Sequence, residues 1–374
     1  SEMCIRDRAS TDGFLVDTRK NFRSISVGPD GAFVSVEPGA TVRAVNGSLA
    51  RHKRKLGPDP ASEIACTIGG VVANNSSGMC CGTEQNSYRT IASLKLVLPS
   101  GLVVDTGAVD ADAKLKSQAP EIFQGLVSLR DRVRNNPESV TTIKKLFSIK
   151  NTMGYGVNSF LDFDSPVKIL EHLIIGSEGT LAFVAEARFN TVPAYSHMAT
   201  GLLVFSTLAD ATRALPDLVA AGFAAIELMD ATSLKIAQRD PEATPELMAL
   251  KVDRHAALLV EFQESNEADL AKKEAGVAAL LASLPLVSTP VMSRDAGVRN
   301  QMWHIRKGLY ATVAGNRPAG TTALLEDIAV PVRALLQTCE DLAKLFVKHG
   351  YEDAVIFGHA RDGNIHFMLN EDFD

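Results

Sequence analysis

We predict an α+β fold in two parts, because the pattern of apolar and turn-forming residues changes about halfway along the 374-residue chain. Up to about residue 190, the apolar runs are short, β-branched and punctuated by glycine, which is typical of strands and tight turns. From about residue 191, longer segments carry apolar residues at i, i+3, i+4 and i+7 and alternate with strand-like runs. This length accommodates two domains of ordinary size.

In the first part, strands are expected in AFVSVEPG (32–39), SLKLVLPSGLVVDT (93–106) and LAFVAEARF (181–189). The second run predicts a hairpin that turns at Pro99, Ser100 and Gly101, because these residue types favour tight turns. One helix is expected, over about 120–135. IIGSEGTLAFV (174–184) is expected to be a strand, a Gly-Ser-Glu-Gly turn and a second strand.

In the second part, the helical spacing predicts three helices, within 205–222, 267–284 and 330–350. Strands are expected between them, in AIELMD (225–230), AALLVEFQ (256–263) and DAVIFGH (353–359). The linker between the two parts is predicted near Thr191, Val192 and Pro193.

The composition excludes several classes of protein. With 38 basic and 44 acidic residues and a net charge of −6, the chain lacks the clustered cations that phosphate neutralisation requires, so no nucleic-acid partner is expected. No apolar run is long enough to span a membrane. The five cysteines are irregularly spaced and form no CxxC, which argues against a disulfide framework, a zinc ribbon or an iron–sulfur motif. We expect a reducing, cytoplasmic setting, with peripheral contact at the inner membrane left open.

Both ends of the chain suggest a fragment. Residues 1–8 (SEMCIRDR) have no helical or strand period, and we expect them to be a non-native leader. The last residue, Asp374, follows closely on a pair of histidines of chemical interest. We therefore expect truncation at both ends.

The segment 57–82, GPDPASEIACTIGGVVANNSSGMCCG, is dense in small residues. Glycines there would let backbone N–H groups approach a phosphate or an isoalloxazine edge. It is neither a GxGxxG fingerprint nor a Walker A loop. The alternative is a small-residue loop in a crowded core. The polar cluster of residues 74–77 needs hydrogen-bond partners in either case.

The segment FGHARDGNIHF predicts a hairpin, because Asp362 and Gly363 lie between two apolar runs. With a two-residue turn, His359 would directly face His366, and the two imidazoles could share one divalent metal ion. The alternative is a stacked pair at a strand edge. Glu326 and Asp327 are the acidic candidates for a third ligand.

The segment MWHIRKGLY (302–310) places Trp303 and Arg306 on one helical face. A guanidinium suits a substrate carboxylate because it can bind both oxygens. The alternative is a core tryptophan beside a surface arginine. His304 points elsewhere on this helix and is expected to be at the surface or structural.

Several of these segments together resemble one family. VEPGATV (36–42), GPDPAS (57–62), CTIGGVVANNSSG (66–78), GYGVNSFLD (154–162) and GSEGTL (176–181) resemble the vanillyl-alcohol oxidase type of flavoprotein. The branch is that of the FAD-dependent D-2-hydroxyacid dehydrogenases, which act on D-lactate, glycolate or D-2-hydroxyglutarate. The resemblance implies an FAD-binding domain over 9–190, with its N-terminal part missing. It implies an α+β cap domain, the FAD-linked oxidase C-terminal domain, over 191–374, with its C-terminal part missing.

The resemblance also implies a site. It implies non-covalent FAD, a divalent zinc or manganese ion held by His359 and His366, and a substrate carboxylate held by Arg306. The third metal ligand and the base would lie beyond Asp374. By match to the family's segments, the residues lining the flavin would be Pro38, Gly39, Pro58, Ser62, Thr67, Ile68, Gly69, Gly70, Asn74, Ser77, Gly78, Glu178, Gly179 and Val184.

The implied reaction is oxidation of a D-2-hydroxyacid to the 2-oxoacid with hydride transfer to the flavin. The electron acceptor would be an iron–sulfur region, a quinone or an electron-transfer flavoprotein. Three departures stand out: the family's Gly-rich pyrophosphate loop is absent before GFLVDT, Leu325 replaces a lysine, and Met368 replaces an asparagine. The alternatives are an FAD-linked oxidase or synthase of the same fold with a sugar or ether-lipid substrate, and an inactive fragment.

Overall fold

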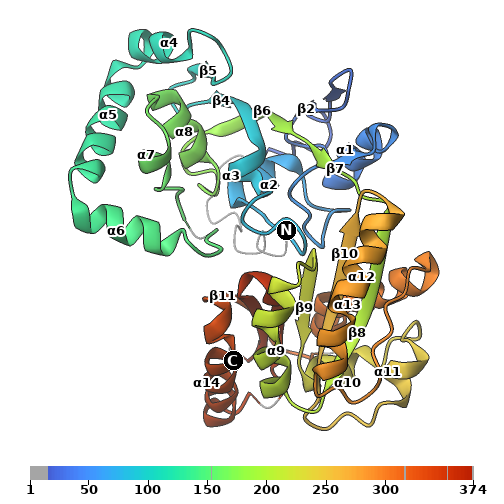
Figure 1. Ribbon diagram of the computed structural model, residues 1–374. Helices are drawn as coiled ribbons and strands as arrows, with labels where there is room; N and C mark the ends of the chain where they lie inside the picture. The colour runs from blue at the N-terminus through green and yellow to red at the C-terminus, as the bar shows by residue number, and fades with distance from the viewer. Residues whose placement is uncertain (1–15, 153, 316, 352, 373–374) are drawn as a thin grey trace. The chain divides into compact units, whose positions relative to one another are not determined.

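The computed structural model describes residues 16–152, 154–315, 317–351 and 353–372 (Figure 1). The chain divides into two compact units, the first ending at Ala194 and the second beginning at Tyr195. The division falls shortly after the predicted linker at 191–193. The expected leader, residues 1–8, lies outside the described residues.

The first unit is built on a five-stranded antiparallel sheet in the order β1-β2-β6-β4-β5. A short pair, β3 and β7, stands apart from it. Alternate side chains of β2 and β6, such as Val34, Val36, Ala187 and Phe189, are fully buried in the core of this unit. The strands are β1 (Ile25–Val27), β2 (Phe33–Val36), β3 (Arg54–Lys55), β4 (Ile91–Val97), β5 (Val103–Asp105), β6 (Phe183–Asn190) and β7 (Val192–Pro193).

The predicted hairpin at 93–106 is present. Strands β4 and β5 pair from Val97 opposite Val103 to Lys95 opposite Asp105. Gly101 has a φ of +84°, a conformation that side-chain-bearing residues rarely adopt, so the turn requires glycine there.

The first unit contains more helices than the sequence predicted. The expected helix is confirmed as α5 (Pro120–Arg134), but we had expected no others. The rest are ten residues or shorter, so they show too few turns for a clear apolar period. They are α1 (Val42–Leu49), α2 (Ile68–Asn74), α3 (Ser87–Thr90), α4 (Ala111–Gln118), α6 (Pro137–Leu146), α7 (Ser159–Asp162) and α8 (Pro166–Ile174).

Helix α8 corrects a specific prediction, because its last residues were expected to form a strand before the Gly-Ser-Glu-Gly turn. The Ser165 side chain accepts a hydrogen bond from the backbone N–H of Lys168, and Pro166 occupies the first turn. These two residues form a standard helix start. The strand predicted after the turn is present as β6.

The second unit is a six-stranded antiparallel sheet in the order β11-β13-β12-β9-β10-β8. The predicted helices and strands of this half are all present. The strands are β8 (His197–Phe205), β9 (Ala225–Met229), β10 (Ala256–Glu264), β11 (Thr322–Ala329), β12 (Val355–His359) and β13 (Asn364–Glu371). The six α-helices within the described residues are α9 (Leu208–Ala220), α10 (Ala231–Ala237), α11 (Pro245–Ala249), α12 (Glu267–Ser283), α13 (Ala296–Gly315) and α14 (Leu335–His349).

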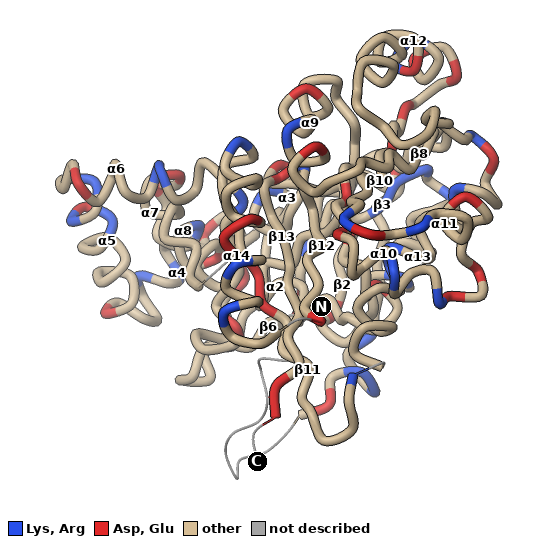
Figure 2. The backbone as a smooth tube through the Cα atoms, turned by 90° about the horizontal axis from the view of Figure 1, so that it is seen from below, with Lys and Arg blue, Asp and Glu red and all other residues tan. Residues whose placement is uncertain are grey.

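Helices cover both faces of this sheet, which explains why β9 and β10 are apolar almost throughout. Leu258 of β10 belongs to one core cluster, together with residues of α9, α12 and α14. Its neighbour Leu259 belongs to a second cluster, together with residues of α10, α11 and α13. On the helices, basic and acidic residues are interspersed, as in α14, where Lys344 pairs with Asp341 at 3.1 Å (Figure 2).

The buried ring of His172 in α8 makes the stability of the first unit depend on pH. It packs against Tyr88 and Phe163, with ring centroids 4.6 and 4.1 Å away. Burial lowers the pKa of His172 to about 4. In the unfolded chain the His172 ring binds a proton as the pH falls below about 6.5, whereas in the folded chain it does so only near pH 4. The stabilisation is therefore complete above pH 6.5 and is lost as the pH falls toward 4.

We predict that His172→Phe weakens this dependence, because phenylalanine keeps the ring packing and cannot be protonated. Between pH 7.5 and pH 5, the wild-type free energy of unfolding should fall by about 2 kcal/mol more than that of the variant. Urea unfolding at both pH values measures the difference, with the exposed His349→Gln as control. Equal losses in wild type and His172→Phe would refute the assignment.

Candidate functional site

The structure brings together two of the segments that the sequence singled out. The turn after α8 packs against the end of α2: the N–H of Gly176 donates to the carbonyl of Val72 at 3.0 Å, and that of Glu178 to Ala73 at 2.8 Å. The Asn74 amide donates to the Glu178 carboxylate at 2.6 Å. Glu178 itself has a φ of +53°. The polar cluster at residues 74–77 thus has a polar partner about a hundred residues away.

Crowding explains several of the glycines in the segment 57–82 and its surroundings. A Cβ on Gly39 would lie 2.1 Å from the carbonyl oxygen of Thr18, and one on Gly78 would lie 2.0 Å from that of Asp59. A Cβ on Gly69 would lie 2.8 Å from the Pro38 ring. The Asp59 carboxylate closes the loop by accepting hydrogen bonds from the N–H groups of Cys80 and Cys81. Close backbone packing therefore accounts for these three glycines without a ligand.

Other residues in this region offer hydrogen-bonding groups or open space to a ligand. The hydroxyls of Ser62 and Ser177 are buried and have no hydrogen-bond partner within the described residues. Gly179 has a φ of +75°, and nothing lies within 4 Å of where its Cβ would be. A cofactor with hydroxyl or phosphate oxygens would satisfy such groups. By contrast, Ile68 and Val184 place their side chains in the core, so only their backbone could contact a cofactor.

The remaining candidates lie on the same elements. The predicted flavin residues occupy the turn after β2, the loop before α2, both ends of α2, the turn after α8 and strand β6. In that order they are Pro38 and Gly39; Pro58 and Ser62; Thr67, Ile68, Gly69, Gly70, Asn74, Ser77 and Gly78; Glu178 and Gly179; and Val184.

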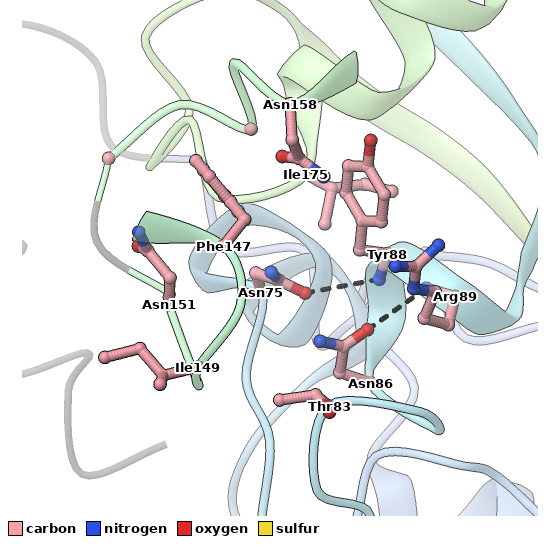
Figure 3. Close-up of a pocket in the computed structure, with 12 residues that line it drawn as sticks. Asn75, Thr83, Asn86, Tyr88, Arg89, Phe147, Ile149, Asn151, Asn158 and Ile175 are labelled. Carbon is pink, nitrogen blue, oxygen red and sulfur yellow. Dashed lines mark hydrogen bonds between the residues drawn. The ribbon is translucent and has the colours of Figure 1, made fainter. Parts of the chain in front are cut away.

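A polar pocket lies beside this region (Figure 3). The Asn75 side chain accepts a hydrogen bond from the N–H of Tyr88 there, and that of Asn86 accepts one from the N–H of Arg89. Its volume of about 50 Å³ holds a water molecule or two and is too small for a flavin ring. Asn75 and Asn86 thus stabilise the backbone of α3 at this pocket.

In the second unit, the hairpin of FGHARDGNIHF is present with a different turn. His359 pairs with Asn364, and Phe357 pairs with His366. The predicted two-residue turn at Asp362 and Gly363 is wrong, as is the direct pairing of the two histidines. A 3₁₀ turn over Ala360–Asp362, followed by Gly363 at φ +68°, makes the loop four residues long. The register changes by two residues, so both histidines still face the same side of the sheet.

The two imidazoles lie diagonally opposite each other across strands β12 and β13, one pair away from direct pairing on the same face. Their Nε2 atoms are 3.3 Å apart, and the rings are nearly perpendicular, with centroids 5.0 Å apart. Both residues are more than nine-tenths buried. The juxtaposition expected from the sequence is therefore present, although the pairing that produces it is not the one predicted.

Each histidine has a carboxylate at its other ring nitrogen. Nδ1 of His359 lies 2.8 and 3.0 Å from the two oxygens of Glu227. Nδ1 of His366 lies 3.2 Å from Asp327. Of the two acidic residues proposed as a third ligand, Asp327 is thus on the histidine face, and it also accepts a hydrogen bond from the Asn364 amide. Glu326 points to the opposite face, because it is the next residue along β11.

Arg306 of α13 completes the cluster. Its side chain is 4% exposed, its Nη2 atom lies 2.7 Å from Glu227, and its guanidinium lies 5.0 Å from the centroid of the Phe357 ring. Its Nε atom is buried without a hydrogen-bond partner among the described residues. Trp303, one turn earlier, donates to Glu261 of β10 at 2.6 Å. The shared helical face of Trp303 and Arg306 therefore lies over the sheet, and the surface-arginine alternative is wrong. His304 is partly exposed and pairs with Asp240.

Sequence reasoning missed Glu227 and Glu261. The signal was available, because each is a lone carboxylate in an otherwise apolar strand, AIELM or AALLVEF. A charge in a fully buried strand requires a partner. Within the described residues, no group of three or more His, Cys, Asp or Glu side chains is arranged to hold a metal ion. Also within them, no helix is both long and apolar enough to cross a membrane.

Comparison with known families agrees with this architecture. The FAD binding domain family matches residues 2–107, and the FAD linked oxidases, C-terminal domain family matches residues 195–374. The chain therefore belongs to the proteins that join an FAD-binding domain to the C-terminal domain of FAD-linked oxidases. The α+β fold class predicted from the sequence is confirmed, and FAD is supported as the cofactor.

The relatives are named for hydroxyacid chemistry. The chain is 26% identical over 348 residues to the glycolate oxidase subunit GlcD of Escherichia coli, covering 92% of this chain and 57% of that protein. It is 24% identical to the D-2-hydroxyglutarate dehydrogenase of Pseudomonas putida, covering 95% of this chain and 36% of that protein. It is 23% identical to the D-lactate dehydrogenase of Archaeoglobus fulgidus, covering 95% and 65%. The chain thus spans less than two thirds of the length of each.

Among solved structures, an alkyldihydroxyacetonephosphate synthase is similar in fold. The TM-score is 0.64 at 16% sequence identity, and the match covers 95% of this chain and 61% of that one. At this identity the likeness concerns the fold alone.

We predict opposite effects for alanine at two glycines of the first unit. Gly78→Ala should lower the free energy of unfolding by about 1–3 kcal/mol, because the new Cβ overlaps the Asp59 carbonyl. Gly47→Ala, in the exposed interior of α1 with nothing within 4 Å, should raise it by up to about 1 kcal/mol. Urea unfolding measures both. Equal stability of the two variants would contradict the crowding argument.

Proposed function

We propose that this protein oxidises a D-2-hydroxyacid to the 2-oxoacid and transfers the hydride to non-covalently bound FAD. We propose further that His359 and His366 bind a divalent metal ion, zinc or manganese, and that Arg306 binds the substrate carboxylate. The observation that carries the proposal is one cluster of two facing imidazoles, each backed by a carboxylate, beside a buried arginine.

The spacing of the imidazoles suits a metal ion. Two nitrogen ligands at about 2.0–2.1 Å from a tetrahedral zinc ion lie about 3.3–3.4 Å apart. The Nε2 atoms of His359 and His366 are 3.3 Å apart. Histidines that bind metals usually donate their other ring N–H to a carboxylate, which orients the ring. Glu227 hydrogen-bonds to Nδ1 of His359 in this way, whereas Asp327 lies 3.2 Å from Nδ1 of His366 without forming a hydrogen bond to it in the described structure. When bound, such an ion polarises a substrate oxygen and lowers the pKa of the attached hydroxyl.

Arg306 suits a carboxylate substrate. Its Nη2 atom pairs with Glu227, and its buried Nε has no hydrogen-bond partner among the described residues, so Nε is available for a second anion. A buried guanidinium donor without a partner is costly, and a substrate carboxylate would satisfy it. The names of the relatives, all oxidoreductases of hydroxyacids, support the same substrate class.

The residues next to His366 favour a substrate with a single carboxylate. Leu325 and Met368 pair across β11 and β13, one step along the sheet from Asp327 and His366 and on the same face. An apolar pair there suits a small apolar side chain such as the methyl group of D-lactate better than a second carboxylate.

In the first unit, we propose that FAD contacts the two segments joined by Asn74 and Glu178, through the predicted flavin residues named above. Non-covalent binding is supported by the state of Cys81, one of the cysteines in this segment. Cys81 is buried, and its sulfur accepts a hydrogen bond from the N–H of Gly78. Flavin that stays attached to the protein after acid precipitation would contradict this.

The rival function is an FAD-linked oxidase or synthase of the same fold with a different substrate. The alkyldihydroxyacetonephosphate synthase structures share the fold but supply no argument about substrate. The histidine pair and Arg306 favour the hydroxyacid reaction, because together they match a hydroxyl and its adjacent carboxylate.

We predict that D-lactate bleaches the visible absorption of the FAD-loaded protein and that L-lactate does not. His366→Ala should slow this reduction by at least about 10²–10³-fold, because the polarising group can no longer be held. The partly exposed His304→Ala should reduce at the wild-type rate. A flavin spectrum that no D-hydroxyacid bleaches would shift the function to the rival class.

We predict that Arg306→Lys raises the KM for D-lactate by about 10–100-fold, because an ammonium ion cannot bind both carboxylate oxygens. Steady-state kinetics with an artificial electron acceptor measures this. Arg299→Lys, seven residues earlier on the same helix, is the matched control and should leave KM within about twofold. An unchanged KM in Arg306→Lys would remove this residue from the substrate site.

A further inference from the structure

We infer that Glu227 is a positioning residue that couples the two halves of this site. Its carboxylate orients Arg306, which would bind the substrate carboxylate, and His359, which would bind the metal ion. The inference rests on the proposed function. It assigns a role to a residue that the sequence-based site did not contain.

Glu227 lies in a strand where a carboxylate is costly. All five residues of β9 are buried, and the Glu227 side chain is fully inaccessible to solvent. An ionised carboxylate at such a position is tolerated only when it is paired and hydrogen-bonded. Its partners are therefore integral to the fold of this sheet.

Two partners reach the same carboxylate from different elements. His359 is directly opposite Glu227 in the pairing of β9 with β12, so their contact follows from the register. Arg306 reaches the carboxylate from α13 with its Nη2 atom at 2.7 Å. The Glu227 carboxylate therefore links three elements: strand β9, the neighbouring strand β12 and helix α13.

Each contact prepares one half of the site. The Glu227 oxygens at 2.8 and 3.0 Å draw the proton of His359 to Nδ1, which leaves the Nε2 lone pair directed at His366. The contact with Nη2 orients the guanidinium and leaves Nε, which has no hydrogen-bond partner among the described residues, for a ligand. A change at Glu227 should therefore disturb metal binding and carboxylate binding together.

Two other carboxylates on this sheet serve as comparisons. Asp327 contacts His366 and Asn364, which places it at the metal half of the site. Glu261 of β10 is 3% exposed and binds Trp303, Thr200 and Gln263. It is as buried as Glu227 and contacts the same helix, but its hydrogen bonds go to other residues.

The test measures the two kinds of binding separately in the FAD-loaded protein. Zn²⁺ alone is titrated calorimetrically, and pyruvate is titrated into protein treated with a chelator, so that its binding reports the arginine. Glu227→Gln should weaken Zn²⁺ binding by about 10–100-fold and pyruvate binding by at least about tenfold. Asp327→Asn should weaken Zn²⁺ binding alone. Glu261→Gln should change neither, even where it lowers the melting temperature.

A second measurement leaves Glu227 intact, in case Glu227→Gln does not fold. Arg306→Lys should weaken Zn²⁺ binding by a few-fold, because the Glu227 carboxylate loses its contact with the guanidinium, whereas Arg299→Lys should not. Glu227→Asp, which keeps the charge, should retain part of both affinities.

The outcomes separate this inference from the proposed function. If the wild-type protein binds Zn²⁺ and pyruvate and Glu227→Gln binds both equally well, the coupling role is refuted and the proposed function stands. If Glu227→Gln lowers stability only, as Glu261→Gln does, its role is structural. If the wild-type protein binds neither ligand, the proposed function fails, and this inference fails with it.

Discussion

The cost of burying a charge organises the second unit. Glu227 is fully inaccessible in a strand with core on both faces, and the sheet around it is arranged so that a histidine and an arginine meet its oxygens. Glu261 on the next strand repeats the arrangement with Trp303 and Thr200. Because α13 supplies a partner to each carboxylate, the helix is held to the sheet by polar contacts at defined points as well as by apolar packing. Polar contacts of this kind fix orientation, which a site for a small polar substrate requires.

The first unit is organised by steric constraint. Its glycines are needed where backbone segments approach one another too closely for a Cβ, as at Gly39 and Gly78. The same approach brings the turn after α8 to the end of α2, where Asn74 and Glu178 meet. The two interpretations of the segment 57–82, a crowded core and a ligand loop, are therefore compatible. The crowding creates the geometry, and the hydroxyls of Ser62 and Ser177, which have no hydrogen-bond partner in the described part of the chain, are available to a ligand.

The sequence predicted the second unit well because its helices are long and its strands carry unbroken apolar runs. It predicted the first unit less completely, because short helices such as α2 lack the turns that reveal a period. At the site, the histidine pair was predicted from a two-residue turn that is wrong, yet the pair is present, because side chains alternate along a strand and a register change of two residues keeps both rings on one face. The contacts of Glu227 with Arg306 and His359 were missed because they join residues roughly eighty to a hundred and thirty positions apart, and such proximity is set by the tertiary fold rather than by local pattern.

The diagonal placement of the histidines has a consequence for how this hairpin can vary between relatives. The direct and the diagonal pairing differ by two residues, and both keep the two rings on one face of the sheet. A slip of the strand register by two residues would therefore preserve the pair, whereas a slip by one residue would turn one ring toward the opposite core. A change in the length of the loop at residues 360–363 that leaves the register of β12 and β13 unchanged keeps both rings in place, so the pair depends on strand register and not on the identity of the loop residues.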